Sequence, residues 1–217
     1  ITFNSTAGAY TLNASAGSAG ASGGTALTMK GDITNNSANA QTINLGLALL
    51  SSSTGIFNTA AGNITIGGVV SGAGVLTKQG SRTLILGANN TYTGATIISG
   101  GTLQIGNGGT SGALNANSTI TNNGTLAFNR SNTITQGTDF ASVLTGAGNI
   151  TQAGSGTLLL TGNNTYIGTT TLSAGTLEVG SAGRLGGGAY AGNISNSGTL
   201  IYSGTNAQTL SGVISGT

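Results

Sequence analysis

The chain contains a long internal repeat, and this repeat limits its possible folds more than any other feature. The segment from Gly80 to Gly106 recurs from Gly154 to Gly180 at a constant offset, without a gap. When the alignment is extended upstream to Gly72 and Gly146, the two copies are identical at 20 of 35 positions. Tandem copies of this kind are typical of architectures in which each unit buries its apolar residues only against its neighbours.

The same offset continues on both sides of the repeat and predicts how the chain is organised. We expect one continuous solenoid over residues 1–217, with divergent coils in 1–68, a first unit in 69–142, a second in 143–212 and the start of a third in 213–217. Because the sequence begins in mid-pattern, we expect it to be a mature fragment or an excised segment of a longer chain.

A shorter period within each unit identifies β-strands. The pattern Thr-Leu-x-apolar begins at Thr83, Thr102, Thr125, Thr157, Thr176 and Thr199. Most of these starts are separated by roughly 20 residues, which matches a solenoid of strands and turns and not the longer helical repeats. The wider gap between Thr125 and Thr157 holds either an inserted loop or an unmarked strand around Asn149 to Thr151. Alternating residues such as Leu84 and Leu86 would form inward ladders when coils stack.

Composition agrees with an all-β solenoid of roughly nine to eleven coils. Glycine accounts for 41 of 217 residues, charged residues for 4%, and proline is absent. Glycine and asparagine allow left-handed corners, whereas glycine and β-branched threonine disfavour helices. Disorder is the alternative for a chain of this composition, but the regular recurrence of Leu, Ile and Val argues against it.

One motif in the repeat is similar to a known family. The stretch GVLTKQGSRTLILGANNTYTGATIISGGTLQIG, from Gly74 to Gly106, resembles the passenger-associated repeat of bacterial autotransporter proteins. The second copy departs from it at Asn149 and Gln152. The resemblance implies a right-handed parallel β-helix that is exported by a Gram-negative bacterium and displayed at the cell surface or released. It does not imply a particular activity, because a fold does not determine function.

The residue types present exclude most enzyme chemistry. The chain has neither His nor Cys, so a Ser-His-Asp site, a thiolate nucleophile and a soft metal site are all excluded. Its three carboxylates, Asp32, Asp139 and Glu178, are far apart in the sequence, whereas glycoside hydrolysis needs two facing carboxylates. We expect no catalytic, cofactor-binding or metal-binding residue, and a polysaccharide-acting β-helix enzyme is a remote alternative.

The positive charges do not indicate a nucleic-acid partner, because such partners require clustered Lys and Arg. The five positive residues are scattered over Lys30, Lys78, Arg82, Arg130 and Arg184. We expect Lys78 and Arg82, the closest pair, to be solvated. The longest apolar run, Leu45 to Leu50, is much shorter than the about 20 residues of a membrane-spanning helix, so membrane insertion of this segment is not expected.

Two Asn-Asn-Thr-Tyr corners recur at the repeat offset. Their predicted structural residues are Asn89, Asn90, Tyr92, Asn163, Asn164 and Tyr166. We expect the asparagines to form amide ladders with equivalent residues of adjacent coils. A sugar-binding platform built on Tyr92 and Tyr166 is the alternative, which their separation by one whole repeat disfavours.

These features favour a non-enzymatic stem at the cell surface that acts as a scaffold or an adhesin. Loops over 107–117 and 181–193 would be displayed to a glycan or protein surface of the host or the environment. The alternative is a subunit that stacks end to end into an extracellular filament, since bare strand edges recruit further strands.

Two further roles concern the outward positions of the marked strands. These positions are unusually apolar and predict a lateral association face that includes Ile85, Leu159 and Ile201. A flanking segment of a longer chain would cover this face equally well. Ice binding would require a regular Thr-x-Thr array, and no such array recurs in the sequence at coil spacing.

Overall fold

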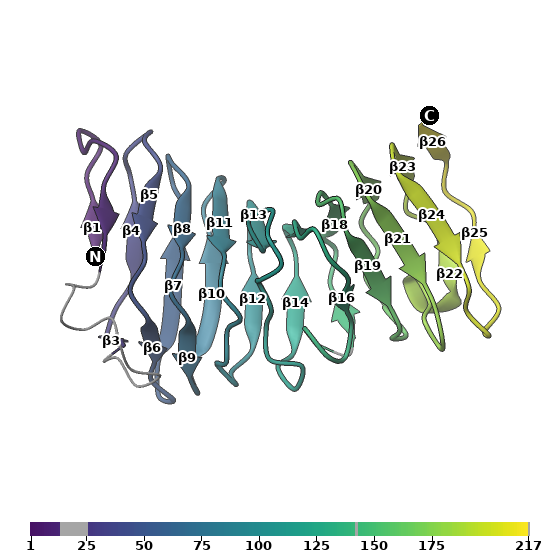
Figure 1. Ribbon diagram of the computed structural model, residues 1–217, viewed down its shortest axis with the longest axis horizontal. Coiled ribbons are helices and arrows are strands. Elements are labelled where there is room, and N and C mark those ends of the chain that lie inside the picture. The colour runs from purple at the N-terminus through teal and green to yellow at the C-terminus, as the bar shows by residue number, and fades with distance from the viewer. Residues whose placement is uncertain (14–25, 142, 217) are drawn as a thin grey trace.

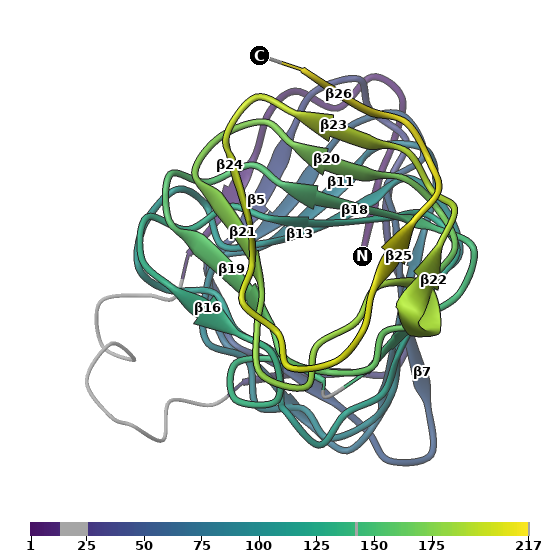
Figure 2. The ribbon, with the colours of Figure 1, turned by 90° about the vertical axis from the view of Figure 1, so that its right-hand side faces the viewer.

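The computed structural model of this protein describes residues 1–13, 26–141 and 143–216. Its paired strands are all parallel, and they stack into one elongated solenoid (Figure 1). From β23 through β24 and β25 to β26 the chain turns counterclockwise as it advances toward the viewer of Figure 2, so the coil is right-handed. The predicted fold, an all-β solenoid of parallel strands, is confirmed.

Two long sheets form two sides of the coil. The seven-stranded sheet contains β1 (Thr2–Phe3), β4 (Ile33–Asn35), β7 (Thr54–Asn58), β10 (Val75–Gln79), β12 (Thr96–Ile98), β14 (Ile120–Asn122) and β17 (Leu144–Thr145). The ten-stranded sheet contains β2 (Thr11–Leu12), β5 (Gln41–Ile43), β8 (Ile64–Ile66), β11 (Thr83–Leu86), β13 (Thr102–Ile105), β15 (Thr125–Phe128), β18 (Asn149–Gln152), β20 (Thr170–Leu172), β23 (Ile194–Asn196) and β26 (Ile214–Gly216).

The third side of the coil is built from shorter sheets. A three-stranded sheet contains β3 (Leu27–Met29), β6 (Leu47–Leu49) and β9 (Val70–Gly72), and a four-stranded sheet contains β16 (Ile134–Thr135), β19 (Thr157–Leu160), β21 (Thr176–Val179) and β24 (Thr199–Tyr202). Two further strands, β22 (Ala189–Tyr190) and β25 (Thr209–Leu210), pair near the C-terminal end, and a short 3-10 turn, η1 (Gly186–Gly188), precedes β22. No described helix is long and apolar enough to cross a membrane.

Stacked aliphatic side chains fill the interior. In the ten-stranded sheet, the register places Leu84, Leu103, Leu126 and Ile150 on one another, and all four are fully buried. Parallel strands are about 4.8 Å apart, so each of these side chains is covered by the coils before and after it. In a single coil these apolar side chains would be exposed to water above and below, which explains why stability in such folds comes from the stack.

Segments that match in sequence do not lie on the same side of the coil. The strands β11, β13 and β15 belong to the ten-stranded sheet, but their counterparts in the second copy, β19, β21 and β24, belong to the four-stranded sheet. From Leu84 to Ile150 the chain completes three turns. The repeat counterpart of Leu84 is Leu158, which lies beyond Ile150. The repeat is therefore longer than three turns, and the additional stretch carries Leu158 onto the next side.

The long gap between marked strands has a simple explanation. The strand β18 fills it and pairs with β15, with Thr125 opposite Asn149. Of the two alternatives for this gap, the unmarked strand is therefore correct. The ten-stranded sheet takes one strand from each coil, so β2 and β26 lie nine turns apart, in agreement with the nine to eleven coils predicted.

Candidate functional site

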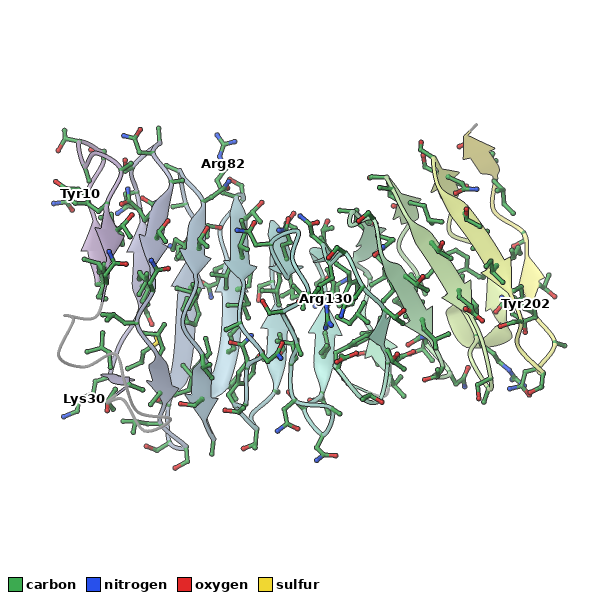
Figure 3. The ribbon with its side chains drawn as sticks, viewed as in Figure 1. Tyr10, Lys30, Arg82, Arg130 and Tyr202 are labelled. Carbon is green, nitrogen blue, oxygen red and sulfur yellow. The ribbon has the colours of Figure 1, made fainter. Side chains whose placement is uncertain are left out.

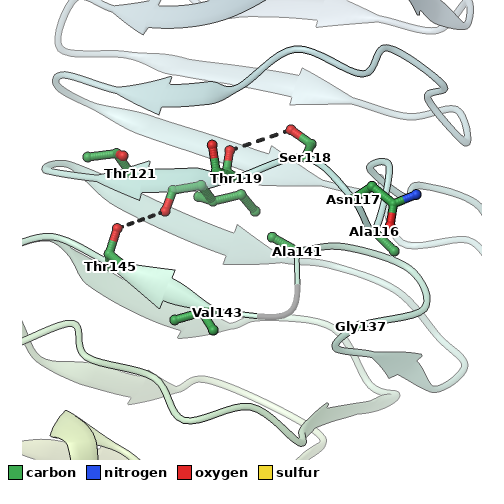
Figure 4. A pocket seen from close by; sticks show the side chains of 10 residues that line it. Ala116, Asn117, Ser118, Thr119, Thr121, Gly137, Ala141, Val143 and Thr145 are labelled. Carbon is green, nitrogen blue, oxygen red and sulfur yellow. Dashed lines mark hydrogen bonds between the residues drawn. The ribbon is translucent and has the colours of Figure 1, made fainter.

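A hollow of about 700 Å³ opens between β14 and β17 on the seven-stranded side. These strands pair at only two positions, Ile120 with Leu144 and Thr121 with Thr145. The segments that precede the two strands separate from each other, which creates the hollow (Figure 4). It is lined by Ala116, Asn117, Ser118, Thr119, Ile120, Thr121, Gly137, Ala141, Val143 and Thr145.

The hollow offers hydroxyl and small apolar groups but no charged or aromatic side chain. Two of its hydroxyls are held by backbone carbonyls: Ser118 Oγ donates to Gly94 O at 2.5 Å, and Thr145 Oγ1 donates to Ile120 O at 3.1 Å. Acid–base or nucleophilic catalysis requires paired titratable groups within hydrogen-bond reach. The lining of the hollow contains no such pair.

Asp139 is held in an ion pair and forms part of the scaffold. Its Oδ1 lies 3.7 Å from Nη1 of Arg130, and its Oδ2 accepts a hydrogen bond from Thr135 N at 2.7 Å. Arg130 is buried and donates from Nη1 to Gly112 O at 3.0 Å and from Nε to Asn132 Oδ1 at 2.9 Å. These contacts join the connection after β15 to the coil before it.

The other carboxylates are not paired with Asp139. Glu178 points outward from β21 and accepts a hydrogen bond from Ser203 Oγ at 2.5 Å. Asp32 lies just before β4, near the N-terminal end of the solenoid. No cluster of three or more metal-ligating side chains occurs in residues 1–13, 26–141 and 143–216.

Lys78 is buried in the interior, so the prediction that it is solvated is wrong. Its Nζ donates to Gln79 O at 2.6 Å, Gly80 O at 2.9 Å and Gly100 O at 3.0 Å. Desolvation lowers the pKa of Lys78 to about 8. The sequence carried a signal for this position, because Lys78 lies two residues after the inward Leu76 and therefore on the same face of the strand.

In the second copy, Gln152 takes the place of Lys78. Its Nε2 donates to Gly154 O and Gly156 O, both at 2.9 Å. Arg82 is exposed, as expected, and projects from the solenoid in Figure 3. The two neighbouring charges thus have opposite environments, because Lys78 lies on the inward face of β10 whereas Arg82 lies in the turn before β11.

The corner asparagines bond to backbone groups of neighbouring coils. Asn90 Oδ1 accepts from Val70 N, and Asn164 Oδ1 accepts from Leu144 N, both at 2.9 Å. Asn89 Oδ1 accepts from Gly112 N at 2.9 Å, whereas Asn163 is exposed. Asn164 also forms a reciprocal amide pair with Gln136: Gln136 Nε2 donates to Asn164 Oδ1 at 2.6 Å, and Asn164 Nδ2 donates to Gln136 Oε1 at 3.1 Å. In place of the predicted ladders of equivalent asparagines, these corners thus bond to backbone groups and to a glutamine.

The corner tyrosines point inward and do not form a sugar-binding surface. Tyr92 and Tyr166 are fully buried, and their hydroxyls lie 2.6 Å from Thr96 Oγ1 and 2.7 Å from Thr170 Oγ1. Burial raises the pKa of both phenols. Tyr190 is also buried and shares the Thr170 hydroxyl at 2.7 Å.

The exposed tyrosines Tyr10 and Tyr202 lie near opposite ends of the solenoid (Figure 3). Sugars are commonly held by stacking on exposed aromatic rings. The described surface between these two ends therefore offers no tyrosine for such stacking, since Tyr92, Tyr166 and Tyr190 are buried.

The predicted association residues lie on two sides. Ile85 is half-buried in the ten-stranded sheet. Leu159 and Ile201 lie in the four-stranded sheet, with Glu178 between them in the register. The three residues therefore do not form one face. The loops over 107–117 and 181–193 likewise follow strands of different sheets, β13 and β21.

Comparison with known proteins identifies the repeat. The family model for the passenger-associated-transport-repeat matches residues 76–105 and 150–179. The chain contains two copies of this passenger-associated-transport-repeat. Each match in this repeat protein begins within a strand of one sheet and ends one coil further, in a strand of the sheet on the following side. No solved structure matches the chain.

One relative of this chain is named as an adhesin. The repeat protein is 34% identical over 173 residues to the "Adhesin BmaC autotransporter" of Brucella suis biovar 1 (strain 1330). The match covers 70% of this chain and 5% of that adhesin. The chain thus spans a small part of its relative, and the activity of the whole relative is not transferred to it by the match.

Proposed function

We propose that this repeat protein is a non-enzymatic stem of a surface-exposed autotransporter passenger, which supports or contributes to adhesion. The observation that carries this proposal is the ten-stranded stack of parallel strands, together with the similarity to an autotransporter adhesin. A rod of this kind holds its outward residues at fixed positions, because every coil is bonded to the next.

The chemistry of the described surface supports a role in contact and display. The described carboxylates Asp139 and Glu178 lie apart and have structural or surface partners. The hollow beside β14 has no titratable lining residue. We propose that the protein is exported to the surface of a Gram-negative bacterium, where glycans or proteins of another surface are its partners.

Adhesion is tested by displaying residues 1–217 on a non-adherent bacterium and counting cells retained on epithelial cells, matrix proteins and polysaccharide coatings. A matched control displays an unrelated rigid segment of similar length. We expect at least a tenfold increase in retention on one of these coatings. Equal retention of the two strains on all coatings would limit the role to that of a spacer.

In the filament alternative, the strand edges of the terminal coils pair with another copy of the chain. In the stem, neighbouring coils of a longer chain would cover the same edges. Electron microscopy of the native material separates the two arrangements. Discrete rods attached to cells support the stem, whereas continuous filaments with an axial repeat support end-to-end polymerisation.

A further inference from the structure

Three successive occurrences of one motif lie on three successive sides of the coil. Val70, Leu144 and Ile214 occupy the same place in the motifs VVSG, VLTG and VISG. They belong to β9 of the three-stranded sheet, β17 of the seven-stranded sheet and β26 of the ten-stranded sheet. This is also the order in which the chain visits the three sides, so each occurrence begins one side further along.

The remaining strands of the repeat show the same shift. The strands β10, β12 and β14 belong to the seven-stranded sheet, whereas their counterparts β18, β20 and β23 belong to the ten-stranded sheet. The shift is therefore a property of the whole unit and not of one displaced strand.

The shift arises in the variable connection that follows β15. Here the chain forms β16 on the third side before it reaches β17, so the unit comprises three turns and one additional side. Several hydrogen bonds tie the additional side to the previous coil. Among them, Arg130 Nη1 donates to Gly112 O at 3.0 Å, and Leu114 N donates to Asp139 O at 2.7 Å. The Arg130–Asp139 ion pair joins the two ends of this connection.

We infer that each tandem copy of this repeat advances the chain by three turns and one side, so that equivalent surfaces return to the same side only in every third copy. With about 4.8 Å per turn, neighbouring copies are displaced by about 16 Å along the axis, and the pattern closes after about 48 Å. Equivalent outward residues follow a screw around the stem.

This arrangement determines which partners can engage the repeated surface. In copy one, Thr83, Thr102 and Thr125 form an outward row on the ten-stranded sheet. The equivalent row in copy two, Thr157, Thr176 and Thr199, lies on the four-stranded sheet. A partner with one flat surface contacts only one such row at a time. Separate partner molecules, in contrast, can bind equivalent rows on all sides of the stem. A stem of three or more copies has no single adhesive side.

Cysteine pairs test the inference directly, because the chain has no cysteine of its own. In the variant Thr125→Cys/Asn149→Cys, the two positions are register partners on adjacent strands, within the Cα distance that a disulfide requires. In the variant Thr125→Cys/Thr157→Cys, the two positions lie in different sheets. The second pair would be adjacent only if both copies occupied the same side.

We expect mild oxidation to crosslink the first pair at least tenfold faster than the second, as read by mass spectrometry of the tryptic peptides, in which each disulfide removes two hydrogen atoms. The pair Thr157→Cys/Thr176→Cys, on neighbouring strands of copy two, is a positive control that confirms folding of that copy. For the third occurrence, Ser195→Cys/Ser215→Cys should crosslink, because β26 pairs with β23 of the ten-stranded sheet. Faster crosslinking of Thr125→Cys/Thr157→Cys than of Thr125→Cys/Asn149→Cys would overturn the inference, whatever the adhesion assay shows.

Discussion

The two copies of the repeat have nearly the same interior although they lie on different sides of the coil. The Tyr92 hydroxyl is 2.6 Å from Thr96 Oγ1 in copy one, and the Tyr166 hydroxyl is 2.7 Å from Thr170 Oγ1 in copy two. Each of these bonds joins two residues of one corner. Because the bond is local, it is preserved when the corner moves to another side.

The copies differ where a side chain depends on its neighbours in other coils. Lys78 donates to three carbonyls, one of them in the following coil, whereas Gln152 donates to two carbonyls in its own corner. Tyr166 packs edge-on against Tyr190 with ring centroids 5.5 Å apart. The local corner is thus the unit that the two copies share, and contacts between coils distinguish them.

The largest expected loss of stability comes from removing either corner tyrosine, Tyr92 or Tyr166, and the two losses can be compared. Tyr92→Ala and Tyr166→Ala should each cost about 3–5 kcal/mol of unfolding free energy, the range for removing a buried aromatic side chain. Tyr166→Ala should cost about 1 kcal/mol more, because it also removes the contact with Tyr190. Urea denaturation followed by circular dichroism measures both, with the Tyr→Phe variants as controls for the hydroxyl. Equal losses would mean that the contact between coils does not distinguish the copies.

The next test concerns the stability of the connection after β15. This connection differs from the repeated strands because it contains the Arg130–Asp139 ion pair. Arg130→Met should cost about 2 kcal/mol, less than for a fully buried pair, because the Asp139 side chain is 27% exposed. Urea denaturation measures the loss. Hydrogen exchange should show the increased opening around β16 first. Arg82→Met, at an exposed site, is the matched control and should change stability by less than about 0.5 kcal/mol.

Lys78 should make stability depend on pH in copy one only. Its pKa is lowered from 10.5 to about 8 in the folded protein, so between these values the unfolded chain binds more protons. Stability therefore rises with pH over this range. Relative to Lys78→Gln, which introduces the residue of copy two, the wild type should gain about 1–2 kcal/mol between pH 7 and pH 9.5.

Urea midpoints of both proteins at each pH measure this difference. Ionisation of tyrosines in the unfolded chain affects both proteins equally and cancels in the comparison. A difference that stays constant from pH 7 to pH 9.5 would show that Lys78 titrates normally in the folded protein.

The smallest expected effect concerns the outward threonine rows. Thr102→Val and Thr176→Val keep the β-branched shape on half-exposed positions of equivalent strands, so each should change stability by less than about 0.5 kcal/mol. Thermal unfolding of both variants checks this. A larger loss in one copy would show that the side of the coil alters the energy of an outward residue.

Much of the fold could be predicted from the spacing of residues. The marked strands, their inward leucines and the stacking of coils follow from the alternation along each strand and from the short period of the Thr-Leu pattern, both of which appear directly in the sequence. The absence of His and Cys excluded several site types without any structure. The burial of Lys78 was detectable in principle from its spacing to Leu76, but its charge favoured the opposite interpretation.

The surface was harder to predict. Ile85, Leu159 and Ile201 have equivalent positions in the pattern, yet the structure separates Ile85 from the other two. Their separation depends on how many sides the connection after β15 crosses. This connection has no Thr-Leu motif, and its short strand β16 (Ile134–Thr135) is two residues long, so no periodic signal marked it.

The sequence by itself determined that this protein is a stack of parallel β-coils with an aliphatic interior, because strand alternation and the repeat period are local properties of the chain. Only the tertiary structure decided which side of the coil each copy occupies, which charges are buried and which outward residues lie together. These properties depend on the cumulative length of every coil, and a connection that adds one side rotates everything that follows it.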